Sequence, residues 1–333
     1  MRALSALCTL LLLIFAAAAL TPTWAQSAGP RLLGAIELPG VEGRIDHLAF
    51  DPSGQRLYVA ALGHNTVEVI DVRSGSHVKS LAGFREPQGI AALPDPHVVA
   101  VANGEGEGLQ ILDPADYRIL RSVALGDDAD NVRYDPAAKR LYVGYGTGAI
   151  AAIDPATGAI VGRATLAGHP ESFQLERSGP RIFVNVPSAG HIAVVDRTTM
   201  KVVATWPVTA AGSNYPMALD DANHRLFVGC RRPARVLAYD TQKGTLLGSS
   251  ESVGDTDDLF FDQQQGRLYV SGGEGFLDVL DARDAAHLAR LTRTATAPGA
   301  RTSLFTPDTG RLYLAVPHRG NQRAEVRVYA MRQ

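Results

Sequence analysis

The segment Arg56-Leu57-Tyr58-Val59 returns along the chain and decides the fold. Further copies are Arg140-Leu141-Tyr142-Val143, Arg181-Ile182-Phe183-Val184, Arg225-Leu226-Phe227-Val228, Arg267-Leu268-Tyr269-Val270 and Arg311-Leu312-Tyr313-Leu314, with a weaker copy at Val99-Ala100-Val101. The position of Tyr58 therefore recurs at 58, 100, 142, 183, 227, 269 and 313, in steps of 41 to 44 residues. A period of this size indicates supersecondary units that stack or form a ring.

One repeat unit contains four β-rich runs, at 47–50, 56–61, 66–72 and 78–81. Each run is bounded by turn residues such as Asp51-Pro52-Ser53-Gly54, which is typical of antiparallel strands in a meander. Seven such units predict an all-β fold, a seven-bladed β-propeller of four-stranded antiparallel blades.

The two ends of the chain complement each other. The last copy, 301–331, holds three strand-like runs, and the run 31–38 stands alone before the first complete unit. A linear solenoid would instead need capping repeats at both ends. We therefore expect the N-terminal strand to become the outer strand of the last blade, so that 26–333 forms one closed domain.

The first 25 residues have the pattern of a signal peptide. Arg2 precedes an apolar run that ends at Leu20, and Thr23-Trp24-Ala25 supplies the small residues of a cleavage site. The apolar run is shorter than the roughly 20 residues of a spanning helix, so no membrane span is expected. The sequence predicts cleavage near Ala25 and a periplasmic or secreted protein.

Charge and cysteine content exclude several classes of partner and cofactor. Without Arg2 the chain has 31 basic and 34 acidic residues, a balance that does not favour nucleic acid. Cys8 leaves with the signal peptide, so Cys230 stands alone and a monomer without disulfides is expected. No Cys-x-x-Cys-His motif is present, which excludes covalent haem.

The stretch Leu57-Tyr58-Val59, followed by Asn65-Thr66-Val67-Glu68-Val69-Ile70-Asp71, resembles the repeat of the YVTN β-propeller family, which includes YncE-like periplasmic proteins. The resemblance covers essentially all of the mature chain. The second unit departs from it by lacking the arginine and aromatic markers, and the seventh by ending in Val328-Tyr329. The family implies a propeller but no single activity.

The loops that precede the first strand of each unit diverge, and they share one face with the turns between second and third strands. At one aligned position these loops carry Asp46, Gln88, Asp130, Glu171, Tyr215, Asp257 and Arg301. The next position carries His47, Gly89, Asn131, Ser172, Pro216, Asp258 and Thr302. This pattern predicts a ligand-binding mouth that includes Asp46, His47, Asp130, Asn131, Glu171, Asp257, Asp258 and Arg301.

Four carboxylates, those of Asp46, Asp130, Glu171 and Asp257, would converge at this mouth. Oxygen ligands of this kind suit Ca²⁺ or Mg²⁺, and His47 could add a nitrogen ligand. The alternative is a water-filled polar channel in which Arg44, Arg133 or Arg301 compensates the carboxylates without an ion. Because like charges repel, at least one of these carboxylates should have a raised pKa.

Other candidates lie in neighbouring turns of the same face. Cys230, placed in the turn Gly229-Cys230-Arg231-Arg232-Pro233, would be a nucleophile if the arginines favour its thiolate, or a buried filler residue otherwise. His47, His169 and His318 are candidate general bases. Arg319 could join Arg301 in clamping a carboxylate or phosphate.

Three functional classes follow from these features. The first is an exported binding or scaffold propeller that holds a small polar ligand, a cation or a periplasmic partner protein at the mouth of the channel. The second is a divalent-cation-dependent hydrolase or lyase similar in principle to propeller lactonases and streptogramin lyases. The third is an accessory subunit of a periplasmic redox system, for which the chain brings no cofactor motif.

Overall fold

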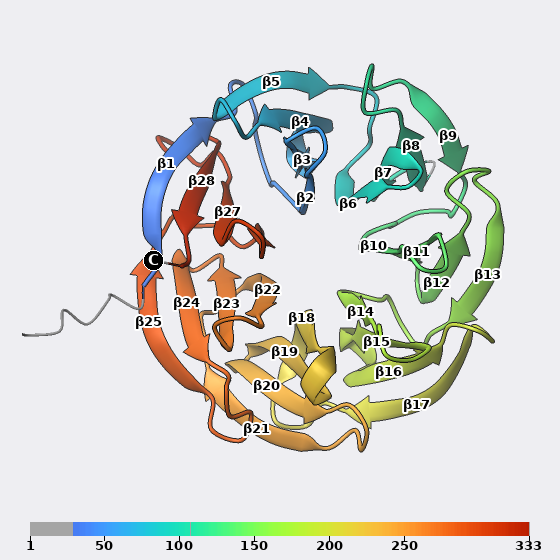
Figure 1. The fold of residues 1–333 in the computed structure, drawn as a ribbon, viewed down its shortest axis with the longest axis vertical. Coiled ribbons are helices and arrows are strands. Elements are labelled where there is room, and N and C mark those ends of the chain that lie inside the picture. The colour runs from blue at the N-terminus through green and yellow to red at the C-terminus, as the bar shows by residue number, and fades with distance from the viewer. Residues whose placement is uncertain (1–28, 107, 333) are drawn as a thin grey trace, which may run out of the picture.

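The computed structural model describes residues 29–106 and 108–332, and these form a ring of seven four-stranded antiparallel sheets around a central channel (Figure 1). The predicted fold class is confirmed. The predicted signal peptide, 1–25, lies outside the described residues.

The strands follow one another outward from the channel in each blade, so that the first strand is innermost and the fourth lies at the rim (Figure 1). Blades 1 to 4 consist of β2 (Leu48–Asp51), β3 (Arg56–Ala61), β4 (Thr66–Asp71) and β5 (Ser76–Leu81); β6 (Pro87–Pro94), β7 (His97–Asn103), β8 (Leu109–Leu112) and β9 (Ile119–Val123); β10 (Val132–Asp135), β11 (Arg140–Tyr145), β12 (Ala149–Ile153) and β13 (Ile160–Thr165); and β14 (Phe173–Leu175), β15 (Arg181–Val186), β16 (His191–Asp196) and β17 (Lys201–Pro207).

Blades 5 to 7 repeat this order. They consist of β18 (Gly212–Asp220), β19 (Arg225–Arg232), β20 (Ala234–Asp240) and β21 (Leu246–Glu251); β22 (Thr256–Asp262), β23 (Arg267–Gly272), β24 (Phe276–Asp281) and β25 (Ala289–Ala295); and β26 (Ser303–Thr306), β27 (Arg311–Val316), β28 (Glu325–Ala330) and β1 (Arg31–Glu37). Three short 3₁₀ helices lie in turns, η1 (Leu62–His64), η2 (Pro187–Ala189) and η3 (Asp221–Asn223).

Ring closure depends on the N-terminal strand, as the sequence predicts. β1 pairs antiparallel with β28, from Arg31 opposite Ala330 to Glu37 opposite Glu325. In Figure 1 the blue β1 lies outside the red β28 in the same blade. The strand therefore completes the last blade with a segment from the other end of the chain, which leaves no three-stranded edge at the seam.

The second strand of each blade carries the repeated motif and is buried along almost its whole length. Leu57, Tyr58 and Val59 are buried because the two faces of a blade both pack on neighbouring blades. Leu57 and Val59 join the cluster shared with blade 7, whereas Tyr58 joins the cluster shared with blade 2. Alternation along one strand thus binds each blade to both neighbours.

Within the residues that the structure describes, no helix combines the length and the apolar character needed to cross a membrane.

Candidate functional site: the mouth of the central channel

The same backbone contact fixes the candidate side chains in several blades. The N–H of Asp46 donates to Ala60 O at 2.7 Å, that of Asp130 to Gly144 O at 2.9 Å, and that of Glu171 to Asn185 O at 3.0 Å. Each acceptor lies on the second strand of its blade, at equivalent positions. The repeat therefore places these carboxylates at equivalent points around the channel, as the alignment of the loops predicts.

A cavity of about 300 Å³ opens at this mouth. Every residue that lines it is polar: Arg44, Gln88, Asp128, Asp130, His169, Glu171, Tyr215, Arg231, Asp257 and Arg301. Six of the seven aligned residues are among them. The seventh, Asp46, accepts a hydrogen bond of 2.8 Å from Arg44 Nη2. Six of the aligned loop residues thus lie together at one cavity, whereas His47 is not among its lining residues. The lining suits a charged, hydrophilic molecule.

His47 lies within the channel among carboxylates from three blades. Its Nδ1 is 3.3 Å from Asp258 Oδ2, and its Nε2 is 3.7 Å from Asp46 Oδ1 and 3.9 Å from Asp130 Oδ1. Burial alone would lower the pKa of His47, but the charges of Asp258 and Asp46 outweigh it and raise the pKa to about 10. The imidazole is therefore a buried cation at neutral pH.

Arginines occupy the side of the mouth formed by blades 5, 6, 7 and 1. Arg231 Nη2 donates to Asp257 Oδ1 at 2.6 Å, and its guanidinium lies 3.7 Å from the centre of the Tyr215 ring. Arg301 Nη2 forms an ion pair of 3.0 Å with Asp255. Arg44 Nη2 lies 3.7 Å from Asp257 Oδ2 in addition to its contact with Asp46. These pairs neutralise carboxylates of the mouth with arginines and without a metal ion, which is the alternative to a cation site that the sequence offers.

Burial raises the pKa of three of the four carboxylates, those of Glu171, Asp46 and Asp257. Burial raises the pKa of Glu171 to about 8, and the charges of Asp130 and Asp257 add to the effect. Burial also raises the pKa of Asp46 to about 6, against the opposing charges of His47 and Arg44. The sequence predicts a raised pKa for at least one carboxylate, and the structure agrees. The main cause is burial, however, and repulsion between the carboxylates contributes less.

Asp130 and His169 differ from these carboxylates, because the shifts of their pKa values favour the charged forms. Burial alone would raise the pKa of Asp130, but the neighbouring His169 and His47 cations lower it. His169 Nδ1 lies 3.2 Å from Asp128 Oδ2 and 2.6 Å from the carbonyl oxygen of Gly146. Burial by itself lowers the pKa of His169, but these acceptors and Asp130 together raise it to about 9. Asp130 is therefore ionised and His169 protonated at neutral pH.

Three buried carboxylate oxygens in this region accept no hydrogen bond: Asp46 Oδ1, Asp130 Oδ1 and Asp257 Oδ2. The side chains of Asp130 and Asp257 line the cavity although both residues are less than 10% exposed. A buried carboxylate oxygen without a donor costs free energy. Asp130 Oδ1 and Asp257 Oδ2 are therefore available as acceptors for a group that enters the cavity.

Asn131 and Asp258, both predicted at the mouth, are not among the residues that line the cavity. Arg133 Nη2 donates to Asn131 Oδ1 at 3.2 Å, and Asp258 Oδ2 accepts from His47 and from the backbone N–H of Ser303 at 2.8 Å. Both side chains support the channel wall.

Cys230 is not at the mouth, and its predicted place in a turn is wrong. It lies inside β19, is completely buried and packs in the cluster between blades 4 and 5. Burial raises the pKa of its thiol to about 12, so the thiol stays protonated. Because successive side chains of a strand alternate, Arg231 faces the other way and reaches the cavity. This alternation is the signal that could have identified Arg231.

His318 and Arg319 also lie apart from the cavity. His318 Nδ1 pairs with Glu42 Oε2 at 2.6 Å, and the backbone of Arg319 bridges to Gln322. Arg319 is not among the cavity-lining residues, and its predicted clamp with Arg301 stays a prediction.

Within residues 29–106 and 108–332, no three His, Cys, Asp or Glu side chains form a group that could hold one metal ion. A Ca²⁺ or Mg²⁺ site built from Asp46, Asp130, Glu171 and Asp257 stays a prediction.

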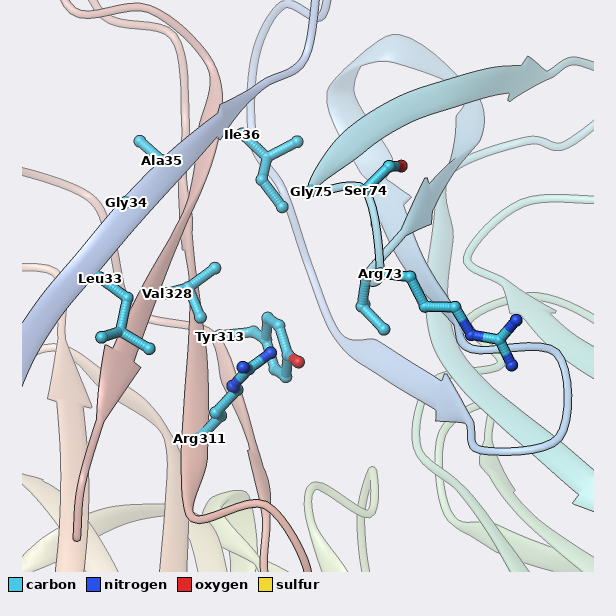
Figure 2. A pocket seen from close by; sticks show the side chains of 11 residues that line it. Leu33, Gly34, Ala35, Ile36, Arg73, Ser74, Gly75, Arg311, Tyr313 and Val328 are labelled. Atoms are coloured by element: carbon cyan, nitrogen blue, oxygen red, sulfur yellow. The ribbon is translucent and has the colours of Figure 1, made fainter. Parts of the chain in front are cut away.

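A separate groove of about 260 Å³ lies at the seam between β1 and the turn that joins β4 to β5 (Figure 2). Leu33 and Ile36 extend from β1 above Arg311 and Tyr313, while the guanidinium of Arg73 points away from them (Figure 2). None of the predicted site residues lines this groove.

Comparison with known proteins identifies the fold alone. No family model matches the chain, and no curated protein matches it. A chain in the crystal structure of a mitotic checkpoint complex superposes with a TM-score of 0.77 at 14% identity, over 97% of this chain and 98% of that one. Kuenenia stuttgartiensis hydrazine synthase superposes with a TM-score of 0.73 at 17% identity, over 87% and 98% of the two chains. Both structural relatives are propellers.

Proposed function

We propose that this protein is a binding propeller whose central cavity holds a small polar ligand with both a cationic and an anionic group. The observation that supports this most is that Asp130 Oδ1 and Asp257 Oδ2, on two buried side chains that line the cavity, accept no hydrogen bond and have cations only at 3.9 Å and 3.7 Å. An ammonium group would supply the missing donors. Export to the periplasm, predicted from residues 1–25, and kinship with the YVTN family belong to the same proposal.

The anionic group would meet Arg44 and Arg301. Within the described residues, the side chain of Arg44 donates a single hydrogen bond, to Asp46, and that of Arg301 is paired through Nη2 with Asp255 at 3.0 Å, so most of the five N–H groups of each guanidinium remain available. The two arginines come from adjacent blades, whose loops touch where Thr302 Oγ1 donates to Ile45 O at 3.4 Å. Uncommitted guanidinium N–H groups favour a carboxylate over a neutral polar group.

The same geometry favours binding over hydrolysis. His47 and His169 have pKa values of about 10 and about 9, so each keeps its proton at neutral pH and is a poor general base. Cys230 is a buried thiol with a pKa of about 12. A cation-dependent hydrolase or lyase is the second candidate, since the open carboxylate oxygens would also accept a metal ion.

Thermal melting of the mature protein with alanine, ethylamine, propionate, Ca²⁺ or Mg²⁺ tests the proposal. We expect alanine to raise the melting temperature more than ethylamine or propionate, which each carry one of its two charges. Arg44→Gln and Asp130→Asn should each reduce the shift caused by alanine, while Arg73→Gln and Asp308→Asn, at exposed positions outside the site, should not.

Two results would overturn the proposal. The first is the absence of any shift with alanine. The second is a shift with Ca²⁺ alone that Asp130→Asn abolishes, which would favour the cation-dependent enzyme instead.

A further inference from the structure

A second cavity adjoins the central one on the same face of the ring. It measures about 500 Å³ and is lined by Leu125, Gly126, Asp127, Asp128, Tyr145, Gly146, Thr147, Gly148, Ala149 and His169. Asp128 and His169 also line the central cavity. We call this second cavity the blade 3 groove, because the turn between β11 and β12 forms part of its wall.

The loop and the turn of blade 3 touch at one end of the groove, where the N–H of Gly146 donates to the carbonyl oxygens of Asp127 and Asp128 at 3.1 Å. In blade 1 a Cβ atom at Gly43 would approach the Cα of Gly63 to 3.0 Å, and in blade 4 one at Gly168 would approach Ser188 Oγ to 2.1 Å. The corresponding loops of those blades thus lie against η1 and η2. In blade 3 the equivalent position is Asp127, and at the preceding Gly126 a Cβ atom would meet nothing within 4 Å.

The turn between β11 and β12 contains two glycines whose backbone conformation excludes larger residues. Gly146 and Gly148 have φ angles of +61° and +155°, which side-chain-bearing residues rarely adopt. A Cβ atom at Gly148 would also approach Leu166 O to 2.7 Å. Positions 146 and 148 of this turn are therefore restricted to glycine. The equivalent turns of blades 1 and 4 contain the 3₁₀ helices η1 and η2.

The chemistry of the groove differs from that of the central cavity. Leu125, Tyr145 and Ala149 give it an apolar part, whereas the central cavity has none. Asp127 adds an exposed carboxylate, whose side chain makes no ion pair or hydrogen bond with the described residues. An aliphatic chain that ends in a cation matches this combination.

The two cavities share Asp128 and His169, and this pair lies beside Asp130 of the central cavity. His169 Nδ1 pairs with Asp128 at 3.2 Å, and its Nε2 lies 4.0 Å from Asp130 Oδ2. Asp130 Oδ1 is the buried oxygen that lacks a donor. A ligand whose ammonium group meets Asp130 would therefore sit next to the opening of the blade 3 groove.

Building on the proposed function, we propose that the ligand is a free amino acid with a basic side chain, of the lysine type. Its α-ammonium group meets Asp130, its α-carboxylate meets Arg44 and Arg301, and its side chain crosses the Asp128–His169 pair into the blade 3 groove toward Asp127. Both α groups must be free, because each one has its own charged partners in the central cavity.

Binding calorimetry with alanine, norleucine, lysine and cadaverine tests this assignment on the mature protein. Norleucine has the chain of lysine without its terminal charge, and cadaverine has both amines without the carboxylate. We expect lysine to bind about fivefold more tightly than norleucine, as a partly exposed ion pair allows, and cadaverine to bind about tenfold more weakly than lysine. Asp127→Asn should make lysine and norleucine equal, whereas Asp308→Asn, which removes an exposed carboxylate outside both cavities, should preserve the difference.

Each failure has a distinct meaning. Equal affinity of the wild-type protein for lysine and norleucine would overturn the role of the groove while leaving the central site in place. Equal affinity for cadaverine and lysine would overturn the role of the arginines. If alanine and norleucine also fail to bind, the proposed function itself is wrong.

Discussion

His47 Nδ1 lies 3.3 Å from Asp258 Oδ2 and so links blade 1 to blade 6 across the channel. Asp258 Oδ2 also accepts the N–H of Ser303 from blade 7 at 2.8 Å. One carboxylate thus joins three blades, two of which flank the seam of the ring. The imidazolium of His47 is the central cation of this group, since it also faces Asp46 and Asp130.

His47→Gln should destabilise the fold. Removing this cation leaves the buried carboxylates of Asp46, Asp130 and Asp258 without their shared partner, and we expect the free energy of unfolding to fall by about 3 kcal/mol. Urea denaturation measures the change. His64→Gln in the same blade is the matched control, because His64 is exposed. A variant at position 47 as stable as this control would show that the imidazole is not required.

Glu171→Gln should change how stability depends on pH. The pKa of Glu171 is raised to about 8, so its contribution is fully present below about pH 4.5, its ordinary pKa, and is lost as the pH rises to 8. Glutamine cannot ionise, so the variant should lose about 4 kcal/mol less stability than the wild-type protein over this interval. Urea denaturation from pH 4.5 to 8.5 measures both curves, and parallel curves would contradict the assignment.

Ile36→Ala should weaken the closure of the ring. Ile36 is the residue of β1 that is buried, in the cluster between blades 7 and 1, and its truncation should cost about 3 kcal/mol of unfolding free energy. Leu33→Ala on the same strand is the control, since Leu33 is 42% exposed. Similar small losses for both variants would indicate that β1 adds little to the closure.

Cys230 should be unreactive in the folded protein. Its side chain is completely buried and burial raises the pKa of its thiol to about 12, so a thiol reagent at pH 8 should label it only after denaturation. The rate of labelling with and without urea measures this difference. Rapid labelling of the native protein would place the thiol at the surface.

Much of the fold could be predicted because the repeat is periodic. Tyr58 and its equivalents mark the second strand of every blade, including the weak copy that became β7, and the isolated run 31–38 corresponds to β1. The loop alignment succeeded for the same reason. Backbone contacts such as that from Asp130 N to Gly144 O recur with the repeat, so one aligned position leads to one cavity.

The remaining features depend on contacts that no repeat determines. Cys230 was misplaced because the sequence does not show where the second strand ends. Its position corresponds to Ala61, Tyr145 and Val186, each the last residue of its strand, and β19 continues to Arg232. The proton affinities of His47 and Glu171 arise from burial and from charges on three or more blades. The blade 3 groove depends on how the loop 125–128 packs beside the turn 145–149, which their sequences do not reveal.

The central claim, that the open carboxylate oxygens at the mouth receive the cationic group of a dipolar ligand, is tested most directly by calorimetric titration of norleucine. We compare the wild-type protein with Asp130→Asn, and use Asp308→Asn to control for the loss of one negative charge. The account predicts that Asp130→Asn weakens norleucine binding about tenfold or more, while Asp308→Asn leaves it unchanged. Equal affinities of all three proteins for norleucine would contradict it.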